Sequence, residues 1–149
     1  MHLLSKMIVF STQKHDGQKC KGGLPYILHP VAVMNNVASI DAKIVAICHD
    51  LLEDTDATVD DLKQLGCSDE IVSAIQTLTK LKGESRIEAA QRVCQNRLAC
   101  EVKIADVTHN MDLSRLPEIT DSAMKRHAQY QQVLEILLHA KVTLWNNFD

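Results

Sequence analysis

The sequence predicts an all-α fold, a single compact helical bundle, and three observations support this prediction. Apolar residues recur at helical spacing along most of the chain, as they do in amphipathic helices. Glycine and proline are scarce, with five and three residues, and they fall between the periodic segments, where turns are expected. Alternation of β-branched and polar residues is almost absent, so no strand is predicted.

The first half of the chain is expected to hold three helices. The first covers about residues 2–15 and turns an apolar face inward, and a glycine-containing loop follows it. Pro30 suits the first turn of the second helix, where a missing amide hydrogen costs little. Asp41 is expected to cap a third helix that continues without a break through Leu51 and Leu52.

Capping signals mark the helices of the second half. Thr58 and Asp61 resemble a capping box at the start of a short helix that ends at Gly66, and Ser68 is expected to cap the next helix. Further helices are predicted at about 86–94, 98–110 and 121–144. The inward face of the last one is expected to consist of Met124, Tyr130, Val133, Leu134, Leu137 and Leu138.

Length, charge and cysteine usage limit the class of protein. A chain of 149 residues suits one domain spanning residues 1–149. The formal net charge of −3 provides no basic surplus, so no nucleic-acid partner is expected. No apolar run reaches the ~18 residues that span a bilayer, so no membrane partner is expected. Five cysteines without a CxxC pair indicate a reducing compartment, and a cytoplasmic location is expected. The oligomeric state is left open.

The most informative segment is AKIVAICHDLLEDTDAT, in which four polar residues interrupt an apolar helix. Residues three or four apart share a helical face, so His49 is expected above Glu53 and Asp50 above Asp54. Three carboxylates beside buried leucines are unfavourable unless they are compensated, and a bound cation is the simplest compensation. The alternative is an ordinary solvated face of the helix.

Two other segments offer ligands of the same kind. Asp106 lies in an apolar helical stretch with Asn110 one turn later, and His29 directly precedes a proline. Each of these residues alone is also compatible with a structural role. Together, His29, His49, Asp50 and Asp106 form a nitrogen and oxygen set that suits Mn²⁺, Fe²⁺ or Zn²⁺ better than Ca²⁺. Four ligands on a six-coordinate ion leave positions for water and a phosphate oxygen.

The ordered set H…HD…D resembles the metal-ligand pattern of the HD-domain phosphohydrolase superfamily. The added pair Glu53 and Asp54, giving HDLLED, resembles the hydrolase domain of RelA/SpoT-type alarmone enzymes and their small single-domain relatives. Three further stretches agree with this resemblance: KHDGQKCKGGLPYILHP, EDTDATVDDLKQLG and VKIADVTHNMDL. Matching residues extend over nearly the whole chain.

The resemblance implies a Mn²⁺-dependent enzyme, or one using another divalent transition metal, that removes the 3′-pyrophosphate from ppGpp or pppGpp. It implies metal ligation by His29, His49, Asp50 and Asp106. It implies that the attacking water is positioned and activated by Glu53 and Asp54. It also implies contacts to the nucleotide from Lys19, Lys21, Tyr26 and Asn110.

Departures from the family pattern leave the nucleotide specificity open. Cys20 stands where the family often has an arginine, and it cannot stack on a base or form a bidentate contact. Asp112 stands where the long enzymes carry arginine, and a carboxylate there would repel a polyphosphate. The alternatives are a phosphatase acting on another nucleotide such as NADPH, and a non-catalytic nucleotide-binding HD module. Retention of every ligand and of the Glu-Asp pair argues against the last.

Overall fold

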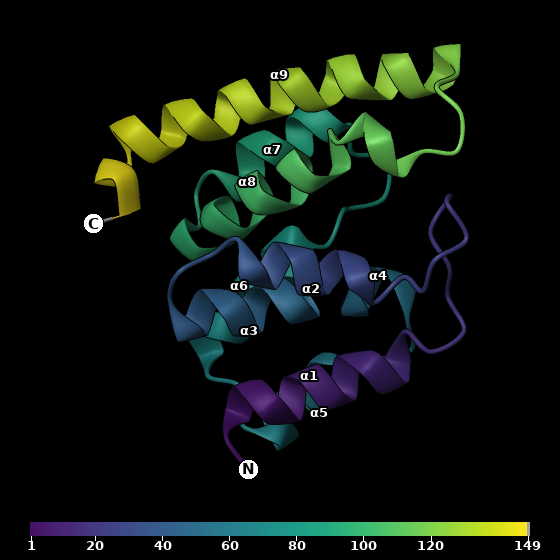
Figure 1. Ribbon diagram of the computed structural model, residues 1–149. Helices are drawn as coiled ribbons and strands as arrows, with labels where there is room; N and C mark the ends of the chain where they lie inside the picture. Colours follow the sequence, from purple (N-terminus) through teal and green to yellow (C-terminus); the bar gives the residue numbers. More distant parts are fainter. Residues whose placement is uncertain (149) are drawn as a thin grey trace.

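The computed structural model describes residues 1–148, and these residues form an all-helical fold, as predicted (Figure 1). In chain order the helices are α1 (Leu3–Lys14), α2 (Leu28–Asn35), α3 (Ile40–Cys48), α4 (Leu51–Asp54), α5 (Val59–Leu65), α6 (Asp69–Leu78), α7 (Arg86–Val93), α8 (Arg97–Asn110) and α9 (Asp121–Thr143). Two 3₁₀ turns complete this part of the chain: η1 (Leu113–Arg115) and η2 (Asn146–Phe148). The β pairing found in residues 1–148 is an isolated bridge between Lys19 and Pro25.

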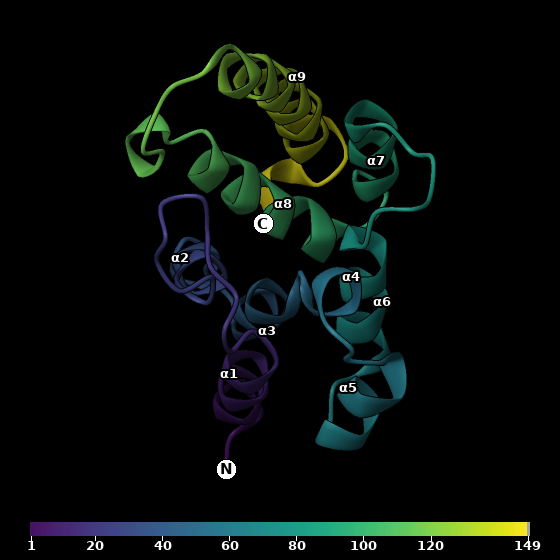
Figure 2. The same cartoon turned by 90° about the vertical axis from the view of Figure 1, so that its right-hand side faces the viewer.

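The helices are stacked in tiers, and α8 lies where the upper tier meets the middle one (Figure 1). Helices α7, α8 and α9 form the upper tier, while α1 and α5 lie at the opposite end (Figure 1). Figure 2 shows α2, α3, α4 and α6 between them. Helix α8 packs against α9 on one side and against α2, α3 and α6 on the other. Helix α3 is the most buried element, because every residue from Ile44 to Cys48 is shielded from solvent.

Local capping explains several helix boundaries. The predicted capping box is confirmed, since the Thr58 side chain accepts from the Asp61 amide and the Asp61 carboxylate accepts from the Thr58 amide. Helix α5 ends at Gly66, whose φ of 109° lies in the left-handed region that favours glycine. The prediction for Ser68 is also confirmed, because its hydroxyl accepts from the Ile71 amide.

The predicted third helix is wrong in both its cap and its length. Ser39, and not Asp41, accepts the amide of Ala42 at the start of α3. The helix ends at Cys48, and the chain turns at His49 and Asp50 before α4 begins. The tighter turn lets the His49 ring bond back to the Ala46 carbonyl oxygen, with Nδ1 2.7 Å away. The polar side chains therefore come from a turn and a short helix and do not lie along one continuous helix.

Helix α9 buries a narrower face than its sequence pattern predicts. Ala123, Val133, Leu137 and Ala140 are buried, whereas Met124 and Leu138 are 46% and 41% exposed. The inward positions predicted for these last two residues are therefore wrong. The reason is that α9 lies on the outside of the bundle, and α7 and α8 cover only one of its sides (Figure 2).

The structure describes the state of the cysteines and the character of the helices. All five cysteines are free thiols, and four of them are buried: Cys48, Cys67, Cys94 and Cys100. Among residues 1–148, no helix has both the length and the apolar character needed to cross a bilayer.

Candidate metal centre and active site

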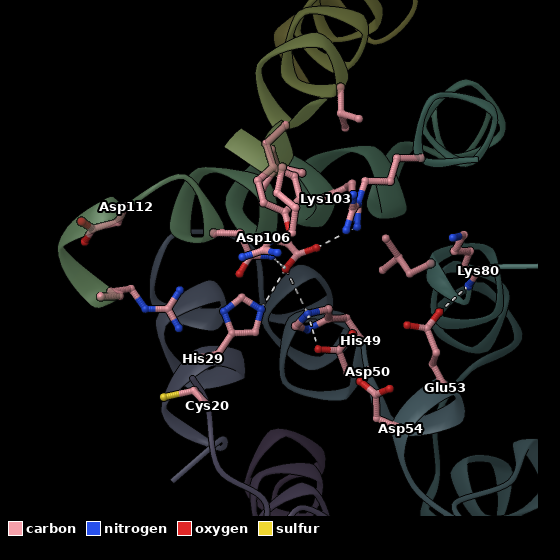
Figure 3. A pocket seen from close by; sticks show the side chains of 18 of the residues that line it. Cys20, His29, His49, Asp50, Glu53, Asp54, Lys80, Lys103, Asp106 and Asp112 are labelled. Carbon is pink, nitrogen blue, oxygen red and sulfur yellow. Dashed lines mark hydrogen bonds and ion pairs between the residues drawn. The ribbon is translucent and has the colours of Figure 1, made fainter. Parts of the chain in front are cut away.

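Three separate parts of the chain place the four predicted metal ligands in one cluster. His29 lies in the first turn of α2, His49 and Asp50 occupy the turn between α3 and α4, and Asp106 lies on α8. Figure 3 shows these four side chains converging on one wall of a pocket. Because α2, α3 and α8 all pack on one another, the fold brings together residues that are 77 positions apart.

The distances within this His/Asp cluster are short. His29 Nε2 lies 2.8 Å from Asp106 Oδ1. His49 Nε2 lies 3.1 Å from Asp50 Oδ2 and 3.4 Å from the same Asp106 Oδ1. His29, His49 and Asp106 are each buried to within 4% of complete shielding, so the donor atoms face one another away from bulk water. In addition, one ligand atom from each of His29, His49 and Asp50 lies within 4.8 Å of the others.

The donor set fits a divalent cation. His49 Nε2 is buried and makes no hydrogen bond within residues 1–148, although two carboxylate oxygens lie close to it. A buried polar atom without a partner is unfavourable, and a cation shared with the neighbouring carboxylates would relieve this. Two imidazoles and two carboxylates are ligands that transition metals accept and that Ca²⁺ uses less often.

Electrostatics in the cluster favour positive charge. Burial alone would lower the pKa of His49, but the carboxylates of Asp50 and Asp106 raise it well above its ordinary value. Burial would likewise raise the pKa of Asp106, yet the Lys103 ammonium and His49 hold it well below the usual range. The cluster thus keeps its carboxylates ionised and attracts cations.

Two residues predicted to contact the nucleotide also support the cluster directly. The Tyr26 hydroxyl donates to Asp50 Oδ2, and the amide nitrogen of Asn110 donates to Asp106 Oδ1 at 3.2 Å. Burial and the Asp50 charge raise the pKa of Tyr26, so its hydroxyl keeps the proton that it donates. Both residues also line the pocket, and their predicted contacts with a nucleotide remain a prediction.

Sequence reasoning missed two further neighbours of the cluster. The Lys103 ammonium donates to Asp106 Oδ2 at 2.8 Å, and the His109 ring bonds to the His29 ring. A lysine one helical turn before the aspartate was the available signal for Lys103, since residues three apart share a face. His109 gave no such signal, because its partner lies on another helix.

Glu53 and Asp54 lie at the exposed edge of the cluster, on the short helix α4. Carboxylate oxygens of Asp50, Glu53 and Asp54 lie within 4.8 Å of one another. Partial burial and the charges of Asp50 and Glu53 raise the pKa of Asp54. The Gln18 side chain donates to the Asp54 carbonyl oxygen at 2.9 Å and ties the first loop to this segment.

The Glu53 carboxylate is held by a backbone amide from the segment after α6. The Lys80 N–H donates to Glu53 Oε1 at 2.8 Å (Figure 3). The preceding residue, Thr79, has φ −80° and ψ 120°, which is compatible with a following proline. Removal of this one donor is therefore a direct test of how strongly it orients Glu53.

We expect Lys80→Pro to lower the turnover number by about fivefold relative to Lys80→Ala, the equivalent of the typical ~1 kcal/mol of one hydrogen bond. Both variants lose the lysine side chain, but only proline loses the N–H. Steady-state kinetics on the two variants measure the difference. Equal turnover numbers for folded Lys80→Pro and Lys80→Ala would show that the amide does not orient Glu53.

The cluster opens into a pocket of about 660 Å³. More basic than acidic side chains line it, although the whole chain is acidic. The basic residues are Lys19, Lys21, Lys80, Arg86, Arg92, Lys103, Arg115 and Arg126. Away from the cluster, the Arg86 guanidinium lies over the Tyr130 ring, 5.3 Å from its centroid. This composition suits a ligand that carries several negative charges and at least one flat ring.

The two departures from the family pattern also line this pocket. Cys20 lies in the turn between Lys19 and Pro25, and Asp112 lies at the far edge of the pocket (Figure 3). The Asp112 carboxylate is occupied as a cap, since its Oδ1 accepts from the Ser114 amide and hydroxyl. These hydrogen bonds lower the pKa of Asp112, so the carboxylate stays ionised and the repulsion expected from the sequence remains.

The fold and the His/Asp cluster define a class: an all-helical domain of this arrangement fits the HD-domain hydrolases. The comparisons name the relatives within that class, although no family model matches the chain. The chain is 38% identical to guanosine-3′,5′-bis(diphosphate) 3′-pyrophosphohydrolase of Haemophilus influenzae, over 65% of this chain and 16% of that protein. It is 34% identical to the bifunctional (p)ppGpp synthase/hydrolase SpoT of Escherichia coli, over 72% of this chain and 17% of SpoT.

A solved structure has the same fold. That structure is of a metazoan ortholog of SpoT that hydrolyzes ppGpp and plays a role in starvation responses, and it superposes on this chain with a TM-score of 0.77. The two chains are 21% identical, and the match covers 92% of this chain and 86% of the other. The chain is thus a homologue of the SpoT and RelA enzymes, and it spans about a sixth of the length of the curated relatives named above.

Proposed function

We propose that the chain is a metal-dependent hydrolase that removes the 3′-pyrophosphate from guanosine alarmones such as ppGpp. The observation that carries the proposal is the convergence of His29, His49, Asp50 and Asp106 beside a pocket with a basic lining. The homology to enzymes named for this reaction supports the choice of substrate over NADPH or a purely binding role.

In this proposal, His29, His49, Asp50 and Asp106 would hold a divalent ion, and Mn²⁺ is the ion that we propose. When bound, such an ion polarises a phosphoryl oxygen and lowers the pKa of water. The chain keeps the ligand carboxylates ionised for this purpose, because Lys103 pairs with Asp106 and Tyr26 donates to Asp50. Burial of the cluster also strengthens these interactions relative to bulk water.

Glu53 and Asp54 would orient the attacking water and accept its proton. The Lys80 amide fixes one Glu53 oxygen, which leaves the other free to accept a hydrogen bond. The raised pKa of Asp54 brings its basicity closer to neutrality, which suits a group that accepts a proton during the reaction. A bond forms between the water oxygen and the phosphorus attached to the ribose 3′-oxygen, and the bond from that phosphorus to the 3′-oxygen breaks. The 3′-oxygen takes up the proton removed from the water, so the products are GDP and pyrophosphate.

The substrate would lie along the basic lining of the pocket. Lys19 and Lys21 on the first loop are proposed to contact the nucleotide, as are Tyr26 and Asn110 beside the cluster. Arginines are suited to a diphosphate because their planar guanidinium can form bidentate contacts. We further propose that residues 1–149 form one HD domain, that the protein works in the cytoplasm, and that it has no nucleic-acid or membrane partner.

The test is incubation of the purified chain with ppGpp and Mn²⁺, with pyrophosphate release followed by a coupled assay and chromatography. We expect release of pyrophosphate with GDP as the nucleotide product, and loss of activity after chelation of the metal. NADPH and a series of nucleoside phosphates serve as comparison substrates. Absence of ppGpp hydrolysis by a folded chain with bound metal would contradict the proposal, and preferred hydrolysis of another nucleotide would replace the substrate.

A further inference from the structure

His109 contacts the ring of His29 from a second helix. The two imidazole planes are inclined by only 16°, with centroids 5.0 Å apart, and the rings meet edge to edge through their nitrogens. Their Nδ1 atoms lie 2.7 Å from each other, which is hydrogen-bond distance. The other nitrogen of His29, Nε2, faces Asp106 at 2.8 Å. Both nitrogens of His29 are therefore committed, one to the cluster and one to His109.

The position of the protons in the cation-bound state follows from this geometry. A hydrogen bond between two Nδ1 atoms needs one proton, so one ring donates and the other accepts. His29 can bind a cation through Nε2 only if that atom carries a lone pair, which places the proton of the neutral ring on Nδ1. His109 must then accept with Nδ1 and carry its own proton on Nε2.

We infer that His109 is a positioning residue that holds His29 in the tautomer and ring orientation needed to bind a divalent cation. A histidine that binds a metal commonly donates its other N–H to a carboxylate, a carbonyl or water, and here an imidazole takes that place. His109 is itself held in the last turn of α8, where the Arg115 guanidinium donates to its carbonyl oxygen at 3.1 Å. The inference rests on the proposed function, since it requires His29 to be a metal ligand.

Two substitutions separate the hydrogen bond from simple ring packing. His109→Phe keeps a flat ring against His29 but has no acceptor. His109→Asn loses the ring but can place an amide oxygen near the position of Nδ1. His139→Phe is the matched control, because His139 is an exposed histidine on α9 and does not line the pocket.

The measurement is Mn²⁺ affinity by titration calorimetry on the full chain, with the melting temperature of each metal-free variant as the check of folding. We expect His109→Phe to weaken Mn²⁺ binding by ~10–100-fold, the usual effect of losing a group that orients a ligand. His109→Asn should recover most of the affinity, and His139→Phe should match the wild type. If the phenylalanine variant does not fold, His109→Gln takes its place. The glutamine amide reaches toward the position of Nε2 and not of Nδ1, so this variant also lacks an acceptor for the His29 proton.

Long-range ¹⁵N–¹H spectra of the Zn²⁺-loaded wild type give a second reading that does not depend on activity. They should show the proton of His29 on Nδ1 and that of His109 on Nε2. His29→Ala serves as the control and should lose Mn²⁺ binding. With that result, wild-type Mn²⁺ affinity in His109→Phe, or no recovery of affinity in His109→Asn, would overturn the role inferred for His109 and leave the proposed function standing. Absence of Mn²⁺ binding by the folded wild type would overturn the proposed function together with it.

Discussion

Replacement of Asp106 by asparagine is expected to abolish hydrolysis and to weaken Mn²⁺ binding by more than 100-fold. Asp106 Oδ1 lies 2.8 Å from His29 Nε2 and 3.4 Å from His49 Nε2, so this carboxylate links the two histidines of the cluster. Asparagine keeps the size and one oxygen but removes the charge that a divalent ion requires. The loss exceeds the ~10–100-fold that follows when only a residue orienting a ligand is removed.

The same substitution leaves Lys103 beside a neutral amide. Removing one partner of a fully buried ion pair costs about 3–5 kcal/mol; Lys103 is only half-buried, so a smaller loss and a moderately lower melting temperature are expected as well. Asp50→Asn is the companion variant, because the Asp50 side chain is 18% exposed and its loss disturbs the core less. Calorimetric titration with Mn²⁺ on both folded variants tests the prediction. Wild-type Mn²⁺ affinity in either of them would exclude that aspartate as a ligand.

Glu53→Gln is expected to lower the turnover number by ~10²–10⁴-fold, the usual contribution of a general base. Glutamine retains an oxygen that can accept from the Lys80 amide, so the local geometry should persist. It cannot accept the proton of the attacking water. Because Glu53 is exposed and is not one of the four proposed metal ligands, Mn²⁺ affinity and melting temperature should stay close to those of the wild type.

The control for Glu53→Gln lies three residues further along the chain. Asp56 is an exposed carboxylate that pairs with Lys14 and does not line the pocket, so Asp56→Asn should keep wild-type turnover. Single-turnover measurements with saturating ppGpp separate the chemical step from binding. A Glu53→Gln variant that binds Mn²⁺ and still turns over at the wild-type rate would remove Glu53 from the mechanism.

Much of the fold could be predicted because its signals are local. The capping box at Thr58 and the left-handed Gly66 depend on residues close in sequence, and both were found in the expected places. The break after Cys48 could not be predicted in this way, since the apolar pattern continues across it. That break is stabilised by His49 bonding to Ala46 and by Tyr26, from another part of the fold, donating to Asp50.

In the candidate site, too, contacts between residues close in the sequence could be predicted, and contacts between distant residues could not. Helical spacing related His49 to its neighbours on the chain, but the link from His29 to Asp106 came from the family resemblance and not from spacing. Their meeting depends on how α2 and α8 pack. The contact of His109 with His29 depends on that packing too. Pairings between two helices have no periodic signature in a single sequence, and the His109 contact was not predicted for this reason. The Lys103–Asp106 pair lies within α8 at a spacing of three residues, so it could have been predicted.

The most direct test of the proposed metal site is a crystal structure of the chain grown with Mn²⁺, with diffraction data collected on both sides of the manganese absorption edge. We expect one strong anomalous peak within bonding distance of His29 Nε2, His49 Nε2 and the carboxylates of Asp50 and Asp106. A peak elsewhere in the fold, or an ordered cluster without manganese in crystals that contain the ion, would contradict it.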